Sequence, residues 1–273
     1  MPLPLIKPYL SKFLSKKLSL ALLTSLALVA CSPADDADTN AEDPVTDAPQ
    51  TEAINNATNE VSRETTAEQN DVAPIEQPIT ILALGDSLTE GLGVNSNDNY
   101  PAQLEATLKD MGYKNVKVVN SGLSGETSTG LVNRLDWVAQ TKPDITILTI
   151  GANDAIRGID VATVEDNIRT AVKRLQDNGS EVILGGMQIY DNLGSDYVDS
   201  FAAIYPRVAK DMNVTLIPFF LDGVGGDPEL NQTDAIHPTK DGYTIIVNDN
   251  ILPILAPKLE ALVEEALIEN ESN

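Results

Sequence analysis

The sequence predicts one α/β domain whose core is a parallel, doubly wound sheet. Between residues 79 and 267, short runs of consecutive aliphatic residues alternate with longer amphipathic segments. Strands that helices cover on both faces have such continuous aliphatic runs, and a regular alternation of strand and helix is typical of parallel sheets. About 190 residues is a usual length for one domain of this class.

Each expected element follows from its local sequence. The aliphatic runs predict five strands, at residues 79–84, 116–119, 145–150, 181–185 and 214–219. The amphipathic segments predict helices at residues 100–111, 129–140, 161–177 and 197–212. A last helical stretch covers residues 240–266. We expect it to be broken or kinked near Pro253 and Pro257, because proline cannot donate the helical hydrogen bond.

The first 30 residues have the pattern of a secretory signal peptide. Lysines precede an apolar run over residues 18–30, which is too short for a comfortable membrane span. The run ends in LVAC at Cys31, the only cysteine, and resembles the lipobox of bacterial lipoproteins, in which the cysteine is lipidated after cleavage. An ordinary export signal with a chance cysteine is the alternative.

The residue after the cysteine indicates a destination. Ser32 stands where lipoproteins kept at the inner membrane typically carry aspartate. By this resemblance we expect an exported bacterial lipoprotein that is anchored in the outer membrane through Cys31 and faces the periplasm. A single cysteine also excludes an internal disulfide and a zinc site built from several thiolates.

Residues 31–77 form an acidic segment between the leader and the α/β domain. Between Ser32 and Pro78 there are twelve acidic residues and one basic residue. This composition cannot bury enough apolar surface to offset the entropy of ordering, so we expect a disordered tether with a reach of about 40 Å. The domain then covers residues 78–268, and residues 269–273 form a polar tail.

The net charge argues against two classes of partner. It is −23 for the whole chain, and removal of the leader with its four lysines takes it to −27. An acidic chain is unsuited to binding nucleic acid or to electrostatic docking on anionic lipid. The membrane contact would come from the lipid on Cys31 instead.

A serine lies directly beyond the first expected strand, which ends in Gly85-Asp86-Ser87. Ligands of open α/β sheets bind outside the carboxyl ends of the strands, so Ser87 is a candidate nucleophile. The alternative is a turn or a helix cap, because glycine, aspartate and serine are common in both.

His237 is the only histidine, and therefore the only imidazole base that the chain offers. Asp234 precedes it by three residues, close enough on a turn to accept a hydrogen bond from one ring nitrogen and fix the tautomer. A lone histidine is more often a surface or core residue, and Asp234 can equally be read as a turn residue or a helix cap.

Donors for an oxyanion are expected at two other strand ends. Gly125 follows the second strand, where glycine lets a backbone N–H approach closely at a helix N-terminus. Asn153 follows the third strand and can donate its side-chain amide, and the Ser87 N–H is a third donor. Taken singly, Gly125 and Asn153 are also ordinary turn residues.

The blocks GDSLTEG, NSGLSGETS, GAND and DAIHP carry Ser87, Gly125, Asn153 and His237 in this order. They resemble the SGNH hydrolases, also called the GDSL esterase/lipase family, and the chain looks like the thioesterase/lysophospholipase/arylesterase branch. The resemblance covers essentially the whole domain. It implies a flavodoxin-like, three-layer α/β/α fold with a five-stranded parallel sheet, and a serine hydrolase of small acyl esters that needs no metal or cofactor. Ala152 departs from the pattern, since this branch often has a second glycine there.

Other interpretations have less support. GLSGE around Ser124 lacks the last glycine of a Gly-x-Ser-x-Gly elbow, so Ser124 is read as a turn or helix-capping residue. A carbohydrate O-deacetylase is an alternative enzyme, for which only Trp137 offers an indole platform. A non-catalytic binding lipoprotein is the alternative from another class, but it has no need of a base and its aspartate. The oligomeric state does not follow from the sequence, and a monomer is the simplest expectation.

Overall fold

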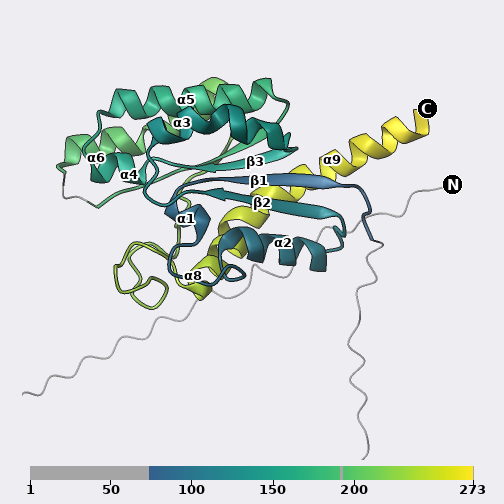
Figure 1. Cartoon of the computed structure of the whole chain (residues 1–273), viewed down its shortest axis with the longest axis horizontal. Coiled ribbons are helices and arrows are strands. Elements are labelled where there is room, and N and C mark those ends of the chain that lie inside the picture. Colours follow the sequence, from purple (N-terminus) through teal and green to yellow (C-terminus); the bar gives the residue numbers. More distant parts are fainter. Residues whose placement is uncertain (1–73, 191–192, 273) are drawn as a thin grey trace, which may run out of the picture. The chain divides into compact units, whose positions relative to one another are not determined.

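Five parallel strands form one sheet in the order β2-β1-β3-β4-β5 (Figure 1). The strands are β1 (Ile79–Gly85), β2 (Val116–Gly122), β3 (Ile145–Thr149), β4 (Glu181–Gly185) and β5 (Thr215–Ile217). The chain winds from β1 to β2 on one side and to β3, β4 and β5 on the other, which is the doubly wound, flavodoxin-like order. The predicted fold class is confirmed.

This computed structural model describes residues 74–190 and 193–272. The expected signal peptide, Cys31 and the acidic segment as far as residue 73 lie outside the described residues. Ile75, which the expected boundary places in the tether, already belongs to the domain. Its N–H donates to the Gly112 carbonyl at 2.9 Å, and its side chain packs against the core. The folded part therefore begins a few residues before residue 78, because the apolar side chain of Ile75 is partly buried against the core.

Helices cover both faces of the sheet (Figure 1). One face carries α3 (Ser128–Val138), α5 (Val161–Asp177), α6 (Ser195–Ala202) and α7 (Ile204–Met212). The other face carries α2 (Tyr100–Asp110), α8 (Lys240–Ile245), the π-helical segment η3 (Ile246–Ile251) and α9 (Leu252–Ser272). Short helices follow two strands directly, α1 (Ser87–Glu90) after β1 and α4 (Ala152–Ile156) after β3, and a 3₁₀ turn, η2 (Ala139–Thr141), follows α3.

Two expected helices differ from the structure. The segment expected at 197–212 is two helices, α6 and α7, that meet at Ala203. In the last stretch, the interruption is the π-helical segment η3, and Pro253 follows as the second residue of α9. Its missing N–H thus falls where the α-helical hydrogen bonds are already interrupted. Pro257 lies inside α9, which continues to Ser272 and so includes most of the expected polar tail.

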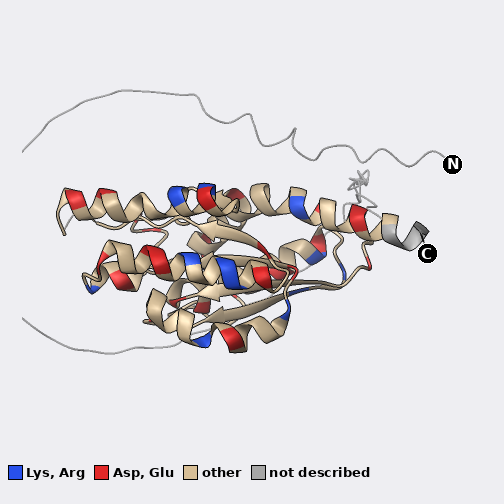
Figure 2. Ribbon diagram, turned by 90° about the horizontal axis from the view of Figure 1, so that it is seen from above, with Lys and Arg blue, Asp and Glu red and all other residues tan. Residues whose placement is uncertain are grey.

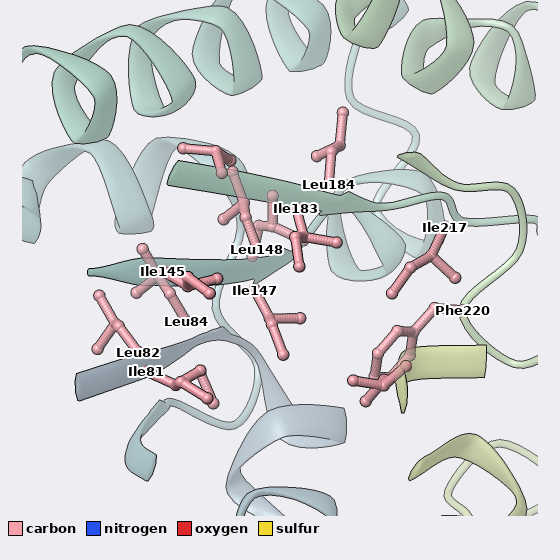
Figure 3. Packing of buried hydrophobic residues seen from close by; sticks show 14 of the residues in the cluster. Ile81, Leu82, Leu84, Ile145, Ile147, Leu148, Ile183, Leu184, Ile217 and Phe220 are labelled. Carbon is pink, nitrogen blue, oxygen red and sulfur yellow. The ribbon is translucent and has the colours of Figure 1, made fainter. Parts of the chain in front are cut away.

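The core consists of the strands' aliphatic side chains and the apolar stripes of the helices that cover them (Figure 3). The close-up shows fully buried residues of four strands and one loop packed together: Ile81, Leu82, Leu84, Ile145, Ile147, Leu148, Ile183, Leu184, Ile217 and Phe220. A close-packed interior of this kind holds the strand ends in fixed positions. The polar residues that follow the strands therefore start from fixed positions at the carboxyl edge of the sheet.

Figure 2 shows acidic and basic residues interspersed along the helices of the part of the chain that the structure describes. Several of them form ion pairs, such as Arg207 and Arg169 with Glu165. Among the residues that the structure describes, no helix is long and apolar enough to cross a membrane.

Candidate active site

The register of the sheet brings three of the expected site residues to one edge. Gly85 of β1 pairs with Gly122 of β2 and with Thr149 of β3. Because these strands run parallel and end in register, the segments that follow them begin side by side. Two to four positions beyond these paired residues come the three expected ones: Ser87, Gly125 and Asn153.

Three side chains are hydrogen-bonded in series at this edge. The Nε2 atom of His237 lies 2.9 Å from Oγ of Ser87, although the two residues are 150 positions apart. Its Nδ1 atom lies 2.7 Å from Oδ2 of Asp234. Ser87 is 8% exposed, so the residue is largely shielded from water. The expected serine, histidine and aspartate are thus brought together.

Asp234 also fixes the turn that carries the histidine. Its Oδ1 atom accepts hydrogen bonds from the backbone N–H groups of Ile236 and His237, so the alternative reading of Asp234 as a turn residue holds as well. The His237 N–H, then the His237 ring and the Ile236 N–H, hold the pKa of Asp234 at about 2. An ionised carboxylate on Nδ1 keeps the proton there and leaves Nε2 as an acceptor toward Ser87.

A tyrosine from another loop supports this turn. Ala235 has a positive φ of 59°, which is uncommon for a residue with a side chain. The Tyr190 hydroxyl donates to the Ala235 carbonyl at 3.0 Å and so ties the loop after β4 to the turn. Sequence reasoning missed Tyr190, because its partner is a backbone atom 45 residues away and nothing in the local sequence marks it.

Gly125 lies in the turn between β2 and α3 with a φ of +77°, which favours glycine. The expectation that it sits at the helix N-terminus is corrected, because α3 begins at Ser128 and its N-cap is Thr127. Ser124 belongs to the same turn, and it is not the cap of α3. Its N–H and hydroxyl both donate to the Glu90 carboxylate, which draws the turn toward α1.

Two arginines also contact the turn that carries Gly125. Nη2 of Arg157, the residue that follows α4, donates to the Gly125 carbonyl at 2.8 Å. Arg134 of α3 forms an ion pair with the buried Glu126 at 2.6 Å and donates to the Ser121 carbonyl at 2.8 Å. These contacts connect the Gly125 turn to the end of β2 and to the helix that carries Asn153. None of them was foreseen from the sequence.

Asp86 precedes Ser87 in the chain and contacts Asn153. It is 1% exposed and is the N-cap of α1, where its Oδ1 accepts from the Leu88 N–H at 3.0 Å. Its Oδ2 accepts from Nδ2 of Asn153 at 3.4 Å. Burial raises the pKa of Asp86 to about 6, against the opposing effects of the Leu88 N–H, the Asn153 amide and His237.

A metal site was not expected from the sequence. Within residues 74–190 and 193–272, no group of three or more histidine, cysteine, aspartate or glutamate side chains could hold a metal ion.

An α/β domain that presents a serine, a histidine and an aspartate hydrogen-bonded in series has the architecture of a serine hydrolase. Residues 83–245 match the model of the GDSL-like lipase/acylhydrolase family, and the chain belongs to this family and is an ester hydrolase. The resemblance inferred from the four sequence blocks is therefore confirmed.

The chain is similar to several relatives along most of their length. It is 35% identical to esterase TesA of Pseudomonas aeruginosa over 181 residues, and this aligned region covers 66% of this chain and 89% of the relative. It is 33% identical over 170 residues to thioesterase 1/protease 1/lysophospholipase L1 of Escherichia coli, covering 62% and 80%. The crystal structure of the psychrotrophic esterase EstA from a Pseudoalteromonas species, inhibited by monoethylphosphonate, superposes with a TM-score of 0.62 at 28% identity, covering 66% and 98%.

Proposed function

We propose that the protein cleaves carboxylic ester or thioester bonds of acyl substrates, with Ser87 as nucleophile, His237 as base and Asp234 as the group that orients the base. The observation that carries the proposal is the pair of hydrogen bonds from Oγ to Nε2 and from Nδ1 to the carboxylate. Relatives that are named esterase and thioesterase/lysophospholipase support this class of substrate.

In the proposed reaction, Oγ of Ser87 bonds to the carbonyl carbon while its proton moves to Nε2 of His237. The electron pair of the carbonyl moves onto oxygen, where the N–H groups of Ser87 and Gly125 and the amide of Asn153 meet it. Collapse expels the alcohol or thiol, which takes the proton from Nε2. A water molecule then attacks the acyl group in the same way, and Ser87 recovers its proton as the acid leaves.

The surroundings of Ser87 favour an apolar acyl group. Ten large apolar side chains of the described residues are exposed, and six of them belong to segments that follow the carboxyl ends of the strands: Ile156 at the end of α4, and Leu92, Leu123, Tyr190, Leu193 and Ile236 in loops. We call these six residues the apolar rim. Exposed apolar side chains gathered on one face of a protein commonly mark a binding surface.

The apolar rim also bears on the carbohydrate alternative. Trp137 is 69% exposed, but it stands nine residues beyond the start of α3. At 1.5 Å per residue, this places it about 14 Å along the helix from the edge where Ser87 lies. An indole at that distance gives no stacking platform for a sugar whose acetyl group is at Ser87. The acyl ester or thioester is therefore the substrate that we propose.

A fluorophosphonate probe and a substrate series test the proposal. The wild-type protein should become labelled at Ser87 and should hydrolyse p-nitrophenyl esters, with a preference that rises beyond acetate as the acyl chain contacts the rim. Ser87→Ala removes the attacking oxygen and should abolish both labelling and hydrolysis. Activity that persists in this variant would reject Ser87 as nucleophile. A preference for acetylated oligosaccharides over all longer acyl esters would favour the deacetylase.

The location of the enzyme is part of the same proposal. We propose an exported lipoprotein, anchored in the outer membrane through Cys31 and facing the periplasm. The LVAC sequence behind a basic and apolar leader supports this location, and Ser32 favours the outer membrane. The acidic segment would then give the catalytic domain its distance from the bilayer.

A further inference from the structure

The orientation of the Asn153 side chain matters to the proposed reaction, because its amide has two different ends. The nitrogen carries two donors and the oxygen is an acceptor. Only the nitrogen can stabilise an oxyanion, whereas the oxygen would repel it. Some neighbouring group must therefore select which end faces the reacting carbonyl.

The Asp86 carboxylate is placed to make this selection. Its Oδ2 atom lies 3.4 Å from Nδ2 of Asn153 and can only accept while it is ionised. One N–H of Asn153 is thereby directed at Asp86, and the second N–H on the same nitrogen stays free for the oxyanion. The other orientation would set the Asn153 oxygen against a buried negative charge.

Several titratable side chains surround Asp86. His237 and Glu126 are the charged or titratable side chains that act on it electrostatically, and the buried phenols of Tyr100, Tyr205 and Tyr243 are affected by its charge.

Each of the three phenols has a hydrogen-bond partner of its own. The Tyr205 hydroxyl donates to the Ile150 carbonyl, and the Tyr243 hydroxyl donates to the Leu88 carbonyl. The Tyr100 hydroxyl pairs with Thr89. Within the described residues, the hydrogen bonds of the Asp86 carboxylate come from the Leu88 N–H and Asn153 alone.

We propose that Asp86 is a positioning residue, which holds the Asn153 amide with its nitrogen toward the site of the oxyanion. This inference rests on the proposed function, and it assigns to Asp86 a role that capping α1 does not require. Capping uses Oδ1, whereas the selection of the amide orientation uses Oδ2.

Asp86→Asn separates the two roles. Asparagine is as good an N-cap as aspartate, so α1 should keep its first hydrogen bond. With its single oxygen on the Leu88 N–H, the new side chain turns its NH₂ toward the NH₂ of Asn153, and two donors cannot pair. The Asn153 amide should then reverse, so that its oxygen accepts from the new NH₂ group at position 86. Its nitrogen would no longer face the site of the oxyanion. We expect kcat to fall about 10-fold to 10²-fold with little change in KM, because the lost contact belongs to the transition state.

A double-mutant cycle on kcat tests whether Asp86 acts through Asn153. The four proteins are the wild type, Asp86→Asn, Asn153→Ala and the double variant. If Asp86 only positions the amide, Asp86→Asn should change kcat less than about twofold once Asn153 is alanine. Asp160→Asn is the matched control, because Asp160 is the N-cap aspartate of α5, accepts from the Ala162 and Thr163 N–H groups, and plays no part in the site.

The outcomes are distinct. A loss of kcat in Asp86→Asn that vanishes in the Asn153→Ala background supports the inference, provided that Asp160→Asn keeps wild-type kcat. Wild-type kcat in Asp86→Asn, or a loss that multiplies in full with that of Asn153→Ala, overturns it. If Asp86→Asn does not fold, Asp86→Ser replaces it in the cycle, since serine can cap α1 but is too short to reach Asn153. The proposed function fails separately, by activity of Ser87→Ala.

Discussion

Replacing Asp86 by asparagine should make the protein more stable at neutral pH while it lowers activity. Burial raises the pKa of Asp86 from its ordinary value of 3.8 to about 6, so ionisation of this carboxyl opposes folding. Each unit of difference between the folded and unfolded pKa corresponds to about 1.4 kcal/mol. The charge of Asp86 therefore costs on the order of 3 kcal/mol of folding free energy at pH 7.

The direction of the Asp86 pKa shift determines the pH range in which its charge lowers stability. The folded protein binds the proton of Asp86 more tightly than the unfolded chain, so the cost is absent below about pH 4. It grows as the pH rises and is complete above about pH 6. Asp234 has the opposite sign, because its pKa is lowered to about 2, and its stabilising contribution is lost only as the pH falls below about 4 toward 2. The two aspartates therefore act in different pH ranges.

The net gain is smaller than the full electrostatic cost. The cost of the charge already includes the favourable effect of the Asn153 amide on the carboxylate, but Asp86→Asn also loses the hydrogen bond that a neutral Asp86 carboxyl can form with Asn153, which contributes about 1 kcal/mol. The variant should thus gain about 2 kcal/mol at pH 7.5, which for a domain of about 190 residues raises Tm by about 4–8 °C. At pH 4 the same variant should have no advantage and should be slightly less stable than the wild type.

Thermal and urea unfolding between pH 4 and pH 8 measure this difference directly. The wild type, Asp86→Asn and the control Asp160→Asn should be compared in the same buffers, so that the effect of capping chemistry is subtracted. A stability difference between wild type and Asp86→Asn that stays constant across this range would refute the reasoning. So would a variant that is less stable than the wild type at pH 7.5 by as much as at pH 4.

Three further substitutions test other parts of the account. Asn153→Ala should lower kcat by about 10²–10³ if the amide is an oxyanion donor, and a change confined to KM would assign it to substrate binding. Asp234→Asn should lower kcat by about 10⁴, because the ring loses the carboxylate that fixes its tautomer, and near wild-type kcat would leave Asp234 as a turn residue only. Cys31→Ser should move the protein from the membrane fraction to the soluble fraction with its esterase activity unchanged, and continued sedimentation with membranes would point to an uncleaved leader.

The strands could be predicted because their signal is local. All five expected strands are present, and helix α5 has the expected bounds, Val161–Asp177. Its buried residues recur with helical spacing, so the pattern is readable without the fold. The form of the last helical stretch could not be predicted from its prolines alone, because Pro253 follows a π-helical segment in which the α-helical hydrogen bonds are already interrupted.

The placement of the candidate site residues at one edge of the sheet could be predicted for a different reason. Ser87, Gly125 and Asn153 each come soon after a strand, and a parallel sheet in register brings such positions together whatever lies between them. The supporting residues have no such rule. Arg157 and Tyr190 reach backbone carbonyls, Gly125 and Ala235, that are 32 and 45 positions away, and a backbone acceptor carries no trace in the sequence.

Asp86 shows where a correct local interpretation is incomplete. The alternative interpretation of Gly85-Asp86-Ser87 was a turn or a helix cap, and the structure has a cap at Asp86, made by a single carboxylate oxygen. The role of the second oxygen depends on burial, which leaves Asp86 1% exposed and raises its pKa, and on β3, which delivers Asn153 beside it. A cap alone would be better served by asparagine, which forms the same hydrogen bond without a buried charge. The charge of Asp86 therefore lowers stability at neutral pH. The need to hold the Asn153 amide with its nitrogen toward the site of the oxyanion accounts for an aspartate at this position.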